Sequence, residues 1–172
     1  MRAPVFLGMI VLAHVVQGVV APHLAIARVK PDLVLLVTLA YGLLYGPGVG
    51  GRFGLISGLL QDLLLGRYLG VFGLTRMAAG YLAGVTERRL YRESLLILIA
   101  TGAGTSVFAD LLFMALMSAT GYPLDPLADM GRVVMPAALY NGLLAPLVYR
   151  AVYRLRRWER TRTRARDGEM VQ

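Results

Sequence analysis

The stretch GRFGLISGLLQDLLLG, residues 51–66, is apolar enough to lie in lipid, yet glycine recurs through it and an acid follows. Four small or acidic residues of this region stand four apart: Gly50, Gly54, Gly58 and Asp62. This spacing places them along one face of a helix, and small residues there let a second backbone approach closely. The pattern therefore predicts a membrane helix with a close-contact face. It leaves open whether that face meets the protein's own helices or a partner's.

The composition extends this interpretation to the whole chain. Of its 172 residues, 57% are hydrophobic and 16% are charged, and the mean hydropathy is +0.62. A soluble domain is usually about half apolar and about a quarter charged, so the long apolar blocks indicate an all-α integral membrane protein. The chain has no cysteine, which excludes disulfides and thiolate metal sites. The net charge of +8 comes from clustered basic residues, and the orientation of a membrane protein explains that clustering. We therefore expect no nucleic-acid partner.

Six segments approach the length of about 20 apolar residues that a membrane helix needs. They are Pro4–Ala21, Leu33–Tyr45, Val49–Leu65, Leu69–Val85, Ser94–Ala119 and Val133–Tyr153. The turn residues Gly46–Gly48 predict a tight hairpin between the second and third segments, and short connections imply antiparallel neighbours in one bundle. We expect six transmembrane helices in one domain over residues 1–153, followed by a basic tail over residues 154–172.

The first segment also has features of a cleavable signal peptide, because small residues follow it at Ala25–Ala27. Only Arg2 precedes the apolar run, however, and Pro22 and His23 interrupt it before the small residues. We therefore expect a first helix that is retained.

Basic residues predict the orientation of the bundle. If both termini are cytoplasmic, thirteen basic residues lie inside: Arg2, Arg52, Arg88, Arg89, Arg92 and the eight arginines from Arg150 to Arg166. Four lie outside: Arg28, Lys30, Arg67 and Arg132. Because cytoplasmic segments carry the excess of basic residues in membrane proteins, we expect both termini in the cytoplasm.

The tail is expected to extend the last helix briefly and then to fray into disorder. Its candidate docking residues are Arg154, Arg156, Arg157, Trp158 and Arg160. The simpler interpretation is attraction to a bilayer with anionic headgroups, worth about 1 kcal/mol per basic residue near the surface. The alternative is a docking site for an acidic cytoplasmic partner.

Three ionisable residues fall within the predicted helices, where charges are costly and normally face the bundle interior: Asp62, Arg76 and Asp110. The helices that carry the two acids both run outward, and a rise of 1.5 Å per residue puts the acids at similar depths. Arg76 lies in the same outer half, so we expect a buried polar cluster with Arg76 between the carboxylates. Asp32, at the outer start of the second helix, is placed where it could join the edge of this cluster. Its alternative role is to stabilise the N-terminus of its own helix, where an acid is favourable.

The sequence carries no recognisable catalytic or cofactor motif. The only histidines are His14 and His23, in or after the first helix and without metal-ligand spacing. The glycines around Pro47 follow no strand of a βαβ unit, so a phosphate-loop interpretation fails on context. We expect a protein that is not an enzyme and that holds no cofactor or metal.

Short motifs stand in a defined order along the helices: Lys30–Leu33, Gly58–Leu63, Leu69–Gly70, Gly80–Gly84, Asp110–Leu111 and Tyr140–Pro146. Together with the length, the six-helix layout and the basic tail, this ordered set resembles the rod shape-determining protein MreD family over nearly the whole chain. The resemblance implies a non-enzymatic, multi-pass component of the cell-elongation machinery in the bacterial inner (plasma) membrane, which supports peptidoglycan synthesis and cell shape. The implied partner is MreC and, indirectly, MreB, RodA and a class B penicillin-binding protein. The implied fold is that of the S components of energy-coupling-factor transporters.

Seven residues are candidates for helix packing or for contact with a partner: Gly50, Gly54, Gly58, Gly80, Gly84, Asn141 and Pro146. Asn141 is able to hydrogen-bond across helices, worth roughly 0.6–2 kcal/mol in a membrane. Pro146 removes a backbone donor and is expected to bend its helix. A packed, bent helix explains these two residues as well as a partner site does.

Two functions follow from these features. A scaffold that binds a partner's membrane helix predicts lipid-facing grooves of small residues and a polar cluster sealed inside the bundle. A substrate-binding subunit (S component) of a vitamin or small-solute transporter predicts an outward-open cavity with aromatic and polar lining. The single Trp in the tail and the short outer loops favour the scaffold.

Overall fold

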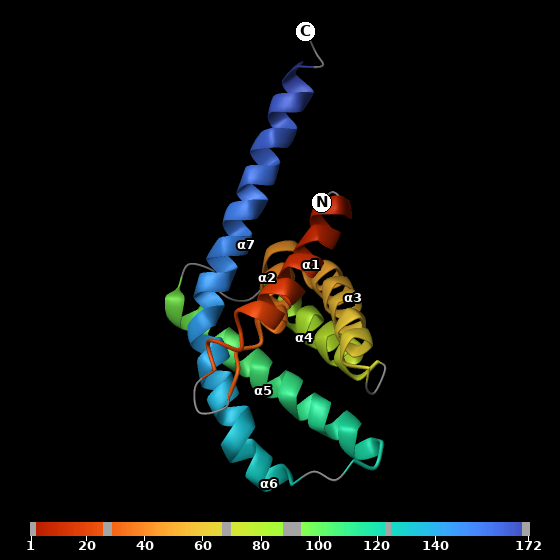
Figure 1. The fold of residues 1–172 in the computed structure, drawn as a ribbon. Helices are drawn as coiled ribbons and strands as arrows, with labels where there is room; N and C mark the ends of the chain where they lie inside the picture. Colours follow the sequence, from red (N-terminus) through yellow and green to blue (C-terminus); the bar gives the residue numbers. More distant parts are fainter. Residues whose placement is uncertain (1–2, 26–28, 67–69, 88–93, 123–124, 170–172) are drawn as a thin grey trace.

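The computed structural model describes residues 3–25, 29–66, 70–87, 94–122 and 125–169, and within these ranges it is helical and has no strand, which confirms the predicted all-α class (Figure 1). Six long helices and two short elements follow one another: α1 (Ala3–Val19), α2 (Leu33–Tyr45), α3 (Pro47–Leu65), α4 (Val71–Glu87), α5 (Leu95–Ala119), α6 (Pro126–Asp129), the π-helical turn η1 (Met130–Val134) and α7 (Met135–Glu169).

The first five predicted segments agree with α1 to α5 to within about two residues at each end, and the bounds of α2 agree fully. The hairpin between α2 and α3 forms because Gly46 adopts a φ of 87° and Pro47 occupies the first turn of α3, a conformation and a position that suit glycine and proline respectively. The last predicted segment differs. Its helix begins at Met135, after the π-helical turn, and continues to Glu169 without a break at residue 153.

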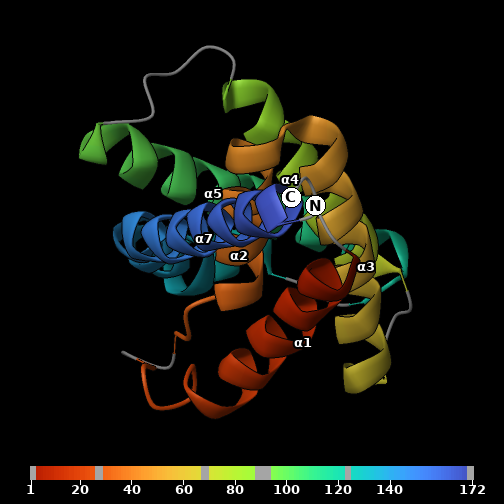
Figure 2. The same cartoon turned by 90° about the horizontal axis from the view of Figure 1, so that it is seen from above.

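Helix α2 is the centre of the bundle. It contacts α1, α3, α4, α5 and α7, and seen from above it lies among them (Figure 2). Every residue from Val34 to Leu44 is buried. At 1.5 Å per residue its 13 residues span about 20 Å, less than the roughly 30 Å hydrocarbon thickness of a bilayer. Because neighbouring helices surround α2, its length is not set by contact with lipid.

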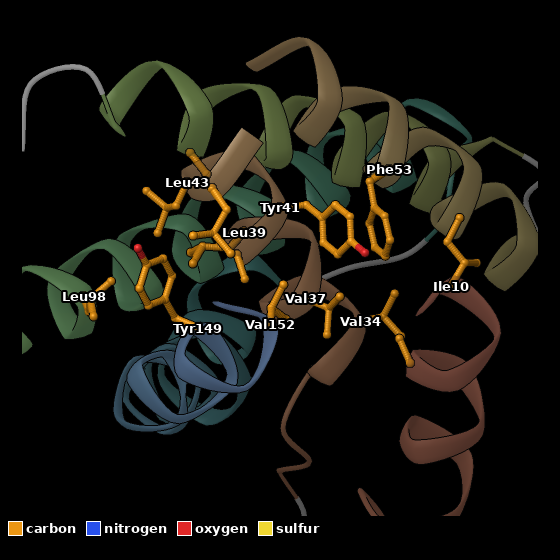
Figure 3. Packing of buried hydrophobic residues seen from close by; sticks show 14 residues of the cluster. Ile10, Val34, Val37, Leu39, Tyr41, Leu43, Phe53, Leu98, Tyr149 and Val152 are labelled. Carbon is orange, nitrogen blue, oxygen red and sulfur yellow. The ribbon is translucent and has the colours of Figure 1, made fainter. Parts of the chain in front are cut away.

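The hydrophobic core forms around α2 (Figure 3). Tyr41 of α2 stacks on Phe53 of α3 with ring centroids 4.1 Å apart, and Phe6 of α1 meets both rings edge-on. On the other side of α2, Leu39 and Leu43 belong to the same cluster as Tyr149 of α7. The cluster therefore joins the first helix, α1, and the last helix, α7, to the central helix.

The glycine face of α3 packs on α4, which answers the question that the sequence left open. A methyl group at Gly54 would overlap the backbone carbonyl of Arg76, and one at Gly58 would overlap the carbonyl of Phe72. Gly50 meets the carbonyl of Gly80 in the same way. The two backbones therefore touch along three turns, a contact that only glycine permits.

The partner face on α4 is also made of glycine. A methyl group at Gly80 would overlap the carbonyl of Gly50, and one at Gly84 would overlap the backbone of Pro47 at the start of α3. Gly51 is different, since a methyl group there would lie 3.7 Å from the nearest atoms of Met77 and Tyr81, an ordinary contact. The close approach therefore depends on one face of α3 and not on its glycine content as such.

The outer surface of the bundle is apolar. Half or more of each of these side chains is exposed: Leu7, Val11 and Val15 on α1, Leu63 and Leu64 on α3, Leu96 on α5, and Leu139, Leu143 and Leu147 on α7. Among the described residues, two helices are long and apolar enough to cross a membrane, Leu95–Ala119 and Met130–Trp158, and two shorter apolar helices cover Pro4–Val19 and Leu33–Tyr45. So large an apolar surface is typical of contact with lipid or with another protein.

Helix α7 continues through the buried Pro146, and its C-terminal part projects beyond the bundle (Figure 1). The projecting end lies on the same side of the bundle as the start of α1. Arg156 anchors this part of α7, because its guanidinium donates to the carbonyl of Leu44 and lies over the ring of Tyr45, 4.6 Å from the centroid. A cation at the C-terminus of α2 also complements the dipole of that helix.

Candidate functional site: a polar network at two helix N-termini

Asp62 occupies the last turn of α3 and binds the start of α4. Its carboxylate accepts hydrogen bonds from the backbone N–H groups of Gly70 at 2.9 Å, Phe72 at 3.1 Å and Gly73 at 3.0 Å. The first N–H groups of a helix have no partner within it, and hydrogen bonds to an ionised acceptor are strong. The side chain is fully buried. Asp62 therefore satisfies the N-terminus of α4 in a place without water.

Arg76, in the second turn of α4, pairs with Asp32. Its two terminal nitrogens donate to the two carboxylate oxygens of Asp32 at 3.0 and 2.9 Å, the two-pronged geometry that guanidinium and carboxylate favour. The side chain of Arg76 is 2% exposed and that of Asp32 is 32% exposed. Asp32 also accepts from the N–H of Leu35 at 2.8 Å and so caps α2. One carboxylate thus joins the start of α2 to the middle of α4.

Two amide side chains complete the N-terminus of α2. Asn141 of α7 accepts from the N–H of Asp32 at 2.9 Å and donates to the hydroxyl of Ser106 on α5 at 2.9 Å. Gln17 of α1 accepts from the N–H of Leu33 at 2.7 Å and donates to the carbonyl of Pro31 at 3.1 Å. Side chains from α1 and α7 therefore satisfy backbone groups of α2, as a helix end in a low-dielectric interior requires.

The predicted cluster is divided in the structure. Arg76 pairs with Asp32 and not with Asp62, which corrects the expected arrangement of Arg76 between two carboxylates. The reason is rotational, because similar depth along two helices does not say which way each side chain points. Asp110 of α5 receives a hydrogen bond from Ser106 at 3.5 Å, so it joins the same network through Ser106 and Asn141.

Two members of the network were missed by sequence reasoning. Gln17 is, with His14, one of two polar side chains in a mostly apolar first helix, and this exception to the apolar pattern is the one available signal. Ser106 stands four residues before Asp110 in α5, and this spacing alone does not reveal that it bridges Asn141 and Asp110.

A cavity of about 710 Å³ opens beside this network. It collects residues from α1, α3, α4, α5, η1, α7 and the segment before α2: Gln17, Val29, Lys30, Pro31, Asp32, Gln61, Phe72, Asp110, Arg132, Val133, Ala137 and Asn141. Asp62 is absent from the lining, and its carboxylate binds the N–H groups of Gly70, Phe72 and Gly73 at the start of α4.

The docking residues proposed for the tail have different environments. Arg156 binds the end of α2 within the protein, as described above. Arg154 and Trp158 are exposed on the projecting part of α7. Arg157 is exposed there as well, and Arg160 lies further along the same helix, with its side chain outside the described part.

We predict that Arg76→Leu lowers the free energy of unfolding by about 2 kcal/mol, because it leaves the Asp32 charge without its partner; the partial exposure of Asp32 limits the loss. Adding Asp32→Asn recovers part of this loss, since asparagine still caps a helix but carries no charge. Adding Asp62→Asn recovers nothing. Thermal unfolding of the purified variants in detergent measures these differences, and recovery by Asp62→Asn in place of Asp32→Asn would contradict the pairing.

Residues 2–158 match the family model described as rod shape-determining protein MreD. The matched range contains every residue of the polar network and ends at Trp158 in the projecting part of α7. No curated protein and no solved structure matches the chain.

Proposed function

The chain belongs to the MreD family, and we propose that it is a non-enzymatic scaffold that binds MreC in the bacterial cell-elongation complex. The family acts in rod-shape determination, is a membrane protein family, and is not a known enzyme family. In the proposed complex MreC connects the protein to MreB, RodA and a class B penicillin-binding protein. Through these contacts the protein supports peptidoglycan synthesis and cell shape.

The observation that carries this proposal is a groove of about 430 Å³ between α4 and α5. Small residues of α5 form one wall, namely Ala100, Thr101, Gly104 and Thr105, and the other lining residues are Leu82, Thr86 and Phe108. A methyl group at Gly104 would meet no atom within 4 Å. The glycines of α3 are used internally, whereas this small-residue wall is open, as a binding site for a partner's membrane helix requires.

A substrate-binding transporter subunit is the second candidate function, and the cavity beside the polar network favours it. Its volume of about 710 Å³ lies within the usual range for small-molecule sites, and Phe72 and several polar groups line it. Such a subunit works with a paired ATPase module, whereas the scaffold works with a single-span partner. The proteins that co-purify therefore distinguish the two functions.

We predict that full-length MreC from the same organism co-purifies in detergent with the wild-type protein and with Gly8→Leu, but not with Gly104→Leu. Both glycines face open space, so neither change disturbs the fold, but only leucine at position 104 fills the groove. Equal thermal stability of the two variants is the control. Recovery of MreC with Gly104→Leu at the wild-type level would exclude the groove, and recovery of an ATPase pair in place of MreC would favour the transporter.

We further propose six membrane spans, formed by α1 to α5 and by η1 with α7, and cytoplasmic termini. The distribution of basic residues supports this orientation. The start of α1 and the end of α7 lie on one side of the bundle (Figure 1), as an even number of spans requires.

The absence of native cysteine makes the topology directly measurable. We predict that a membrane-impermeant maleimide added to cells with a permeabilised outer membrane labels Asp125→Cys and does not label Arg154→Cys. Both positions are exposed in the structure. Labelling of Arg154→Cys in sealed cells would reverse the proposed orientation.

A further inference from the structure

The ion pair of Asp32 and Arg76 at the cavity is already satisfied within the protein. Both carboxylate oxygens of Asp32 are occupied, since they accept from Arg76 and Leu35. Arg76 is committed to the same pair. The pair therefore neutralises itself, and whatever else the cavity offers to a ligand comes from its other residues.

Two hydrogen-bond acceptors in the cavity lack adequate donors. Among the described residues, the carboxylate of Asp110 accepts one long hydrogen bond, from the Ser106 hydroxyl at 3.5 Å, which is weak at that distance. The side-chain oxygen of Gln61 is buried and has no partner among the described residues. Both residues line the cavity, and a buried acceptor without a donor is unfavourable. A ligand group with several N–H donors would therefore satisfy the acceptors in the interior of the cavity.

Two cations lie at the exposed part of the same cavity. Lys30 and Arg132 line it and are exposed, and within the described part of the chain neither forms an ion pair. Guanidinium and ammonium groups in this position suit an anionic oxygen group, above all a phosphate. A ligand that satisfies the whole cavity therefore carries a donor group at one end and an anion at the other.

We propose that the cavity binds a zwitterion with a primary ammonium and a phosphate, the headgroup chemistry of phosphatidylethanolamine. The ammonium has three N–H donors, which match the carboxylate of Asp110 and the side-chain oxygen of Gln61. The phosphate faces Arg132 and Lys30. A lipid is the favoured source because an exposed apolar side chain forms part of the cavity lining, namely Val133, which is 50% exposed. This site is independent of the α4–α5 groove proposed for MreC.

The test is the thermal shift of the full-length protein in detergent with three probes: dihexanoyl-phosphatidylethanolamine, dihexanoyl-phosphatidylcholine and free phosphoethanolamine. Phosphatidylcholine has the same charges but no N–H donor, so we expect it to bind at least about tenfold more weakly than the ethanolamine lipid. Asp110→Asn weakens binding of the ethanolamine lipid by about tenfold. The matched change Asp125→Asn, in the segment before α6 and away from the cavity lining, leaves it unchanged.

Gln61→Leu gives a second test that does not depend on how Asp110→Asn folds. It removes an acceptor that has no partner, so the melting temperature of the ligand-free protein does not fall, while the affinity for the ethanolamine lipid does. Equal affinity for the ethanolamine and choline lipids, or unchanged affinity in both cavity variants, would overturn the proposal. Binding of free phosphoethanolamine as tightly as the lipid, with the same dependence on Asp110, supports the ligand chemistry and assigns it to a soluble molecule.

Discussion

Helices α3 and α4 approach so closely that a side chain on the glycine face of α3 would overlap the backbone of α4. Gly54 lies against the carbonyl of Arg76, and Gly58 lies against the carbonyl of Phe72. This contact fixes α4 in both height and rotation relative to α3. The carboxylate of Asp62, one turn after Gly58 on the same face, is thereby brought to the first N–H groups of α4. The polar interactions of the bundle follow from this placement.

The next consequence concerns α2, the short helix at the centre. With α4 held by α3, Arg76 reaches Asp32 at the start of α2, and Asn141 and Gln17 bind backbone groups of the same helix end. Arg156 binds the other end at Leu44. A helix shorter than the hydrocarbon thickness of a bilayer is stable there because the side chains of other helices satisfy its ends. The ion pair is therefore one of the contacts that hold this helix terminus within the bundle.

The sequence predicted the elements better than their contacts. The bounds of α2 and the close-contact face of α3 are local properties, set by apolar runs, turn glycines and a four-residue spacing. The partner of Arg76 is not local. Each residue turns a helix by about 100°, so a small error in rotation moves a side chain from one neighbour to another, and depth alone favoured Asp62 over Asp32. The length of α7 was missed because its apolar run ends near residue 153 while the helix continues through basic residues.

For function too, local sequence patterns predicted one part and the contacts between helices were needed for the other. An ordered set of short motifs was enough to identify the MreD family, because it spans nearly the whole chain. The candidate site required the structure, since its cavity gathers residues from seven parts of the chain. Within it, the hydrogen bonds separate residues that hold the helices together, such as Asp62 and Asn141, from residues with unused hydrogen-bonding capacity, such as Gln61 and Asp110.

The close contact of α3 with α4 is tested most directly by comparing Gly54→Ala with Gly51→Ala in unfolding experiments in detergent. Both glycines are buried, one turn of α3 carries both, and alanine improves the helix propensity equally at the two positions. We predict that Gly54→Ala lowers the free energy of unfolding by about 1–3 kcal/mol, because the methyl group forces the two backbones apart. Gly51→Ala is expected to leave the stability unchanged or to raise it slightly. Equal effects of the two substitutions would show that the glycine face of α3 does not hold α4.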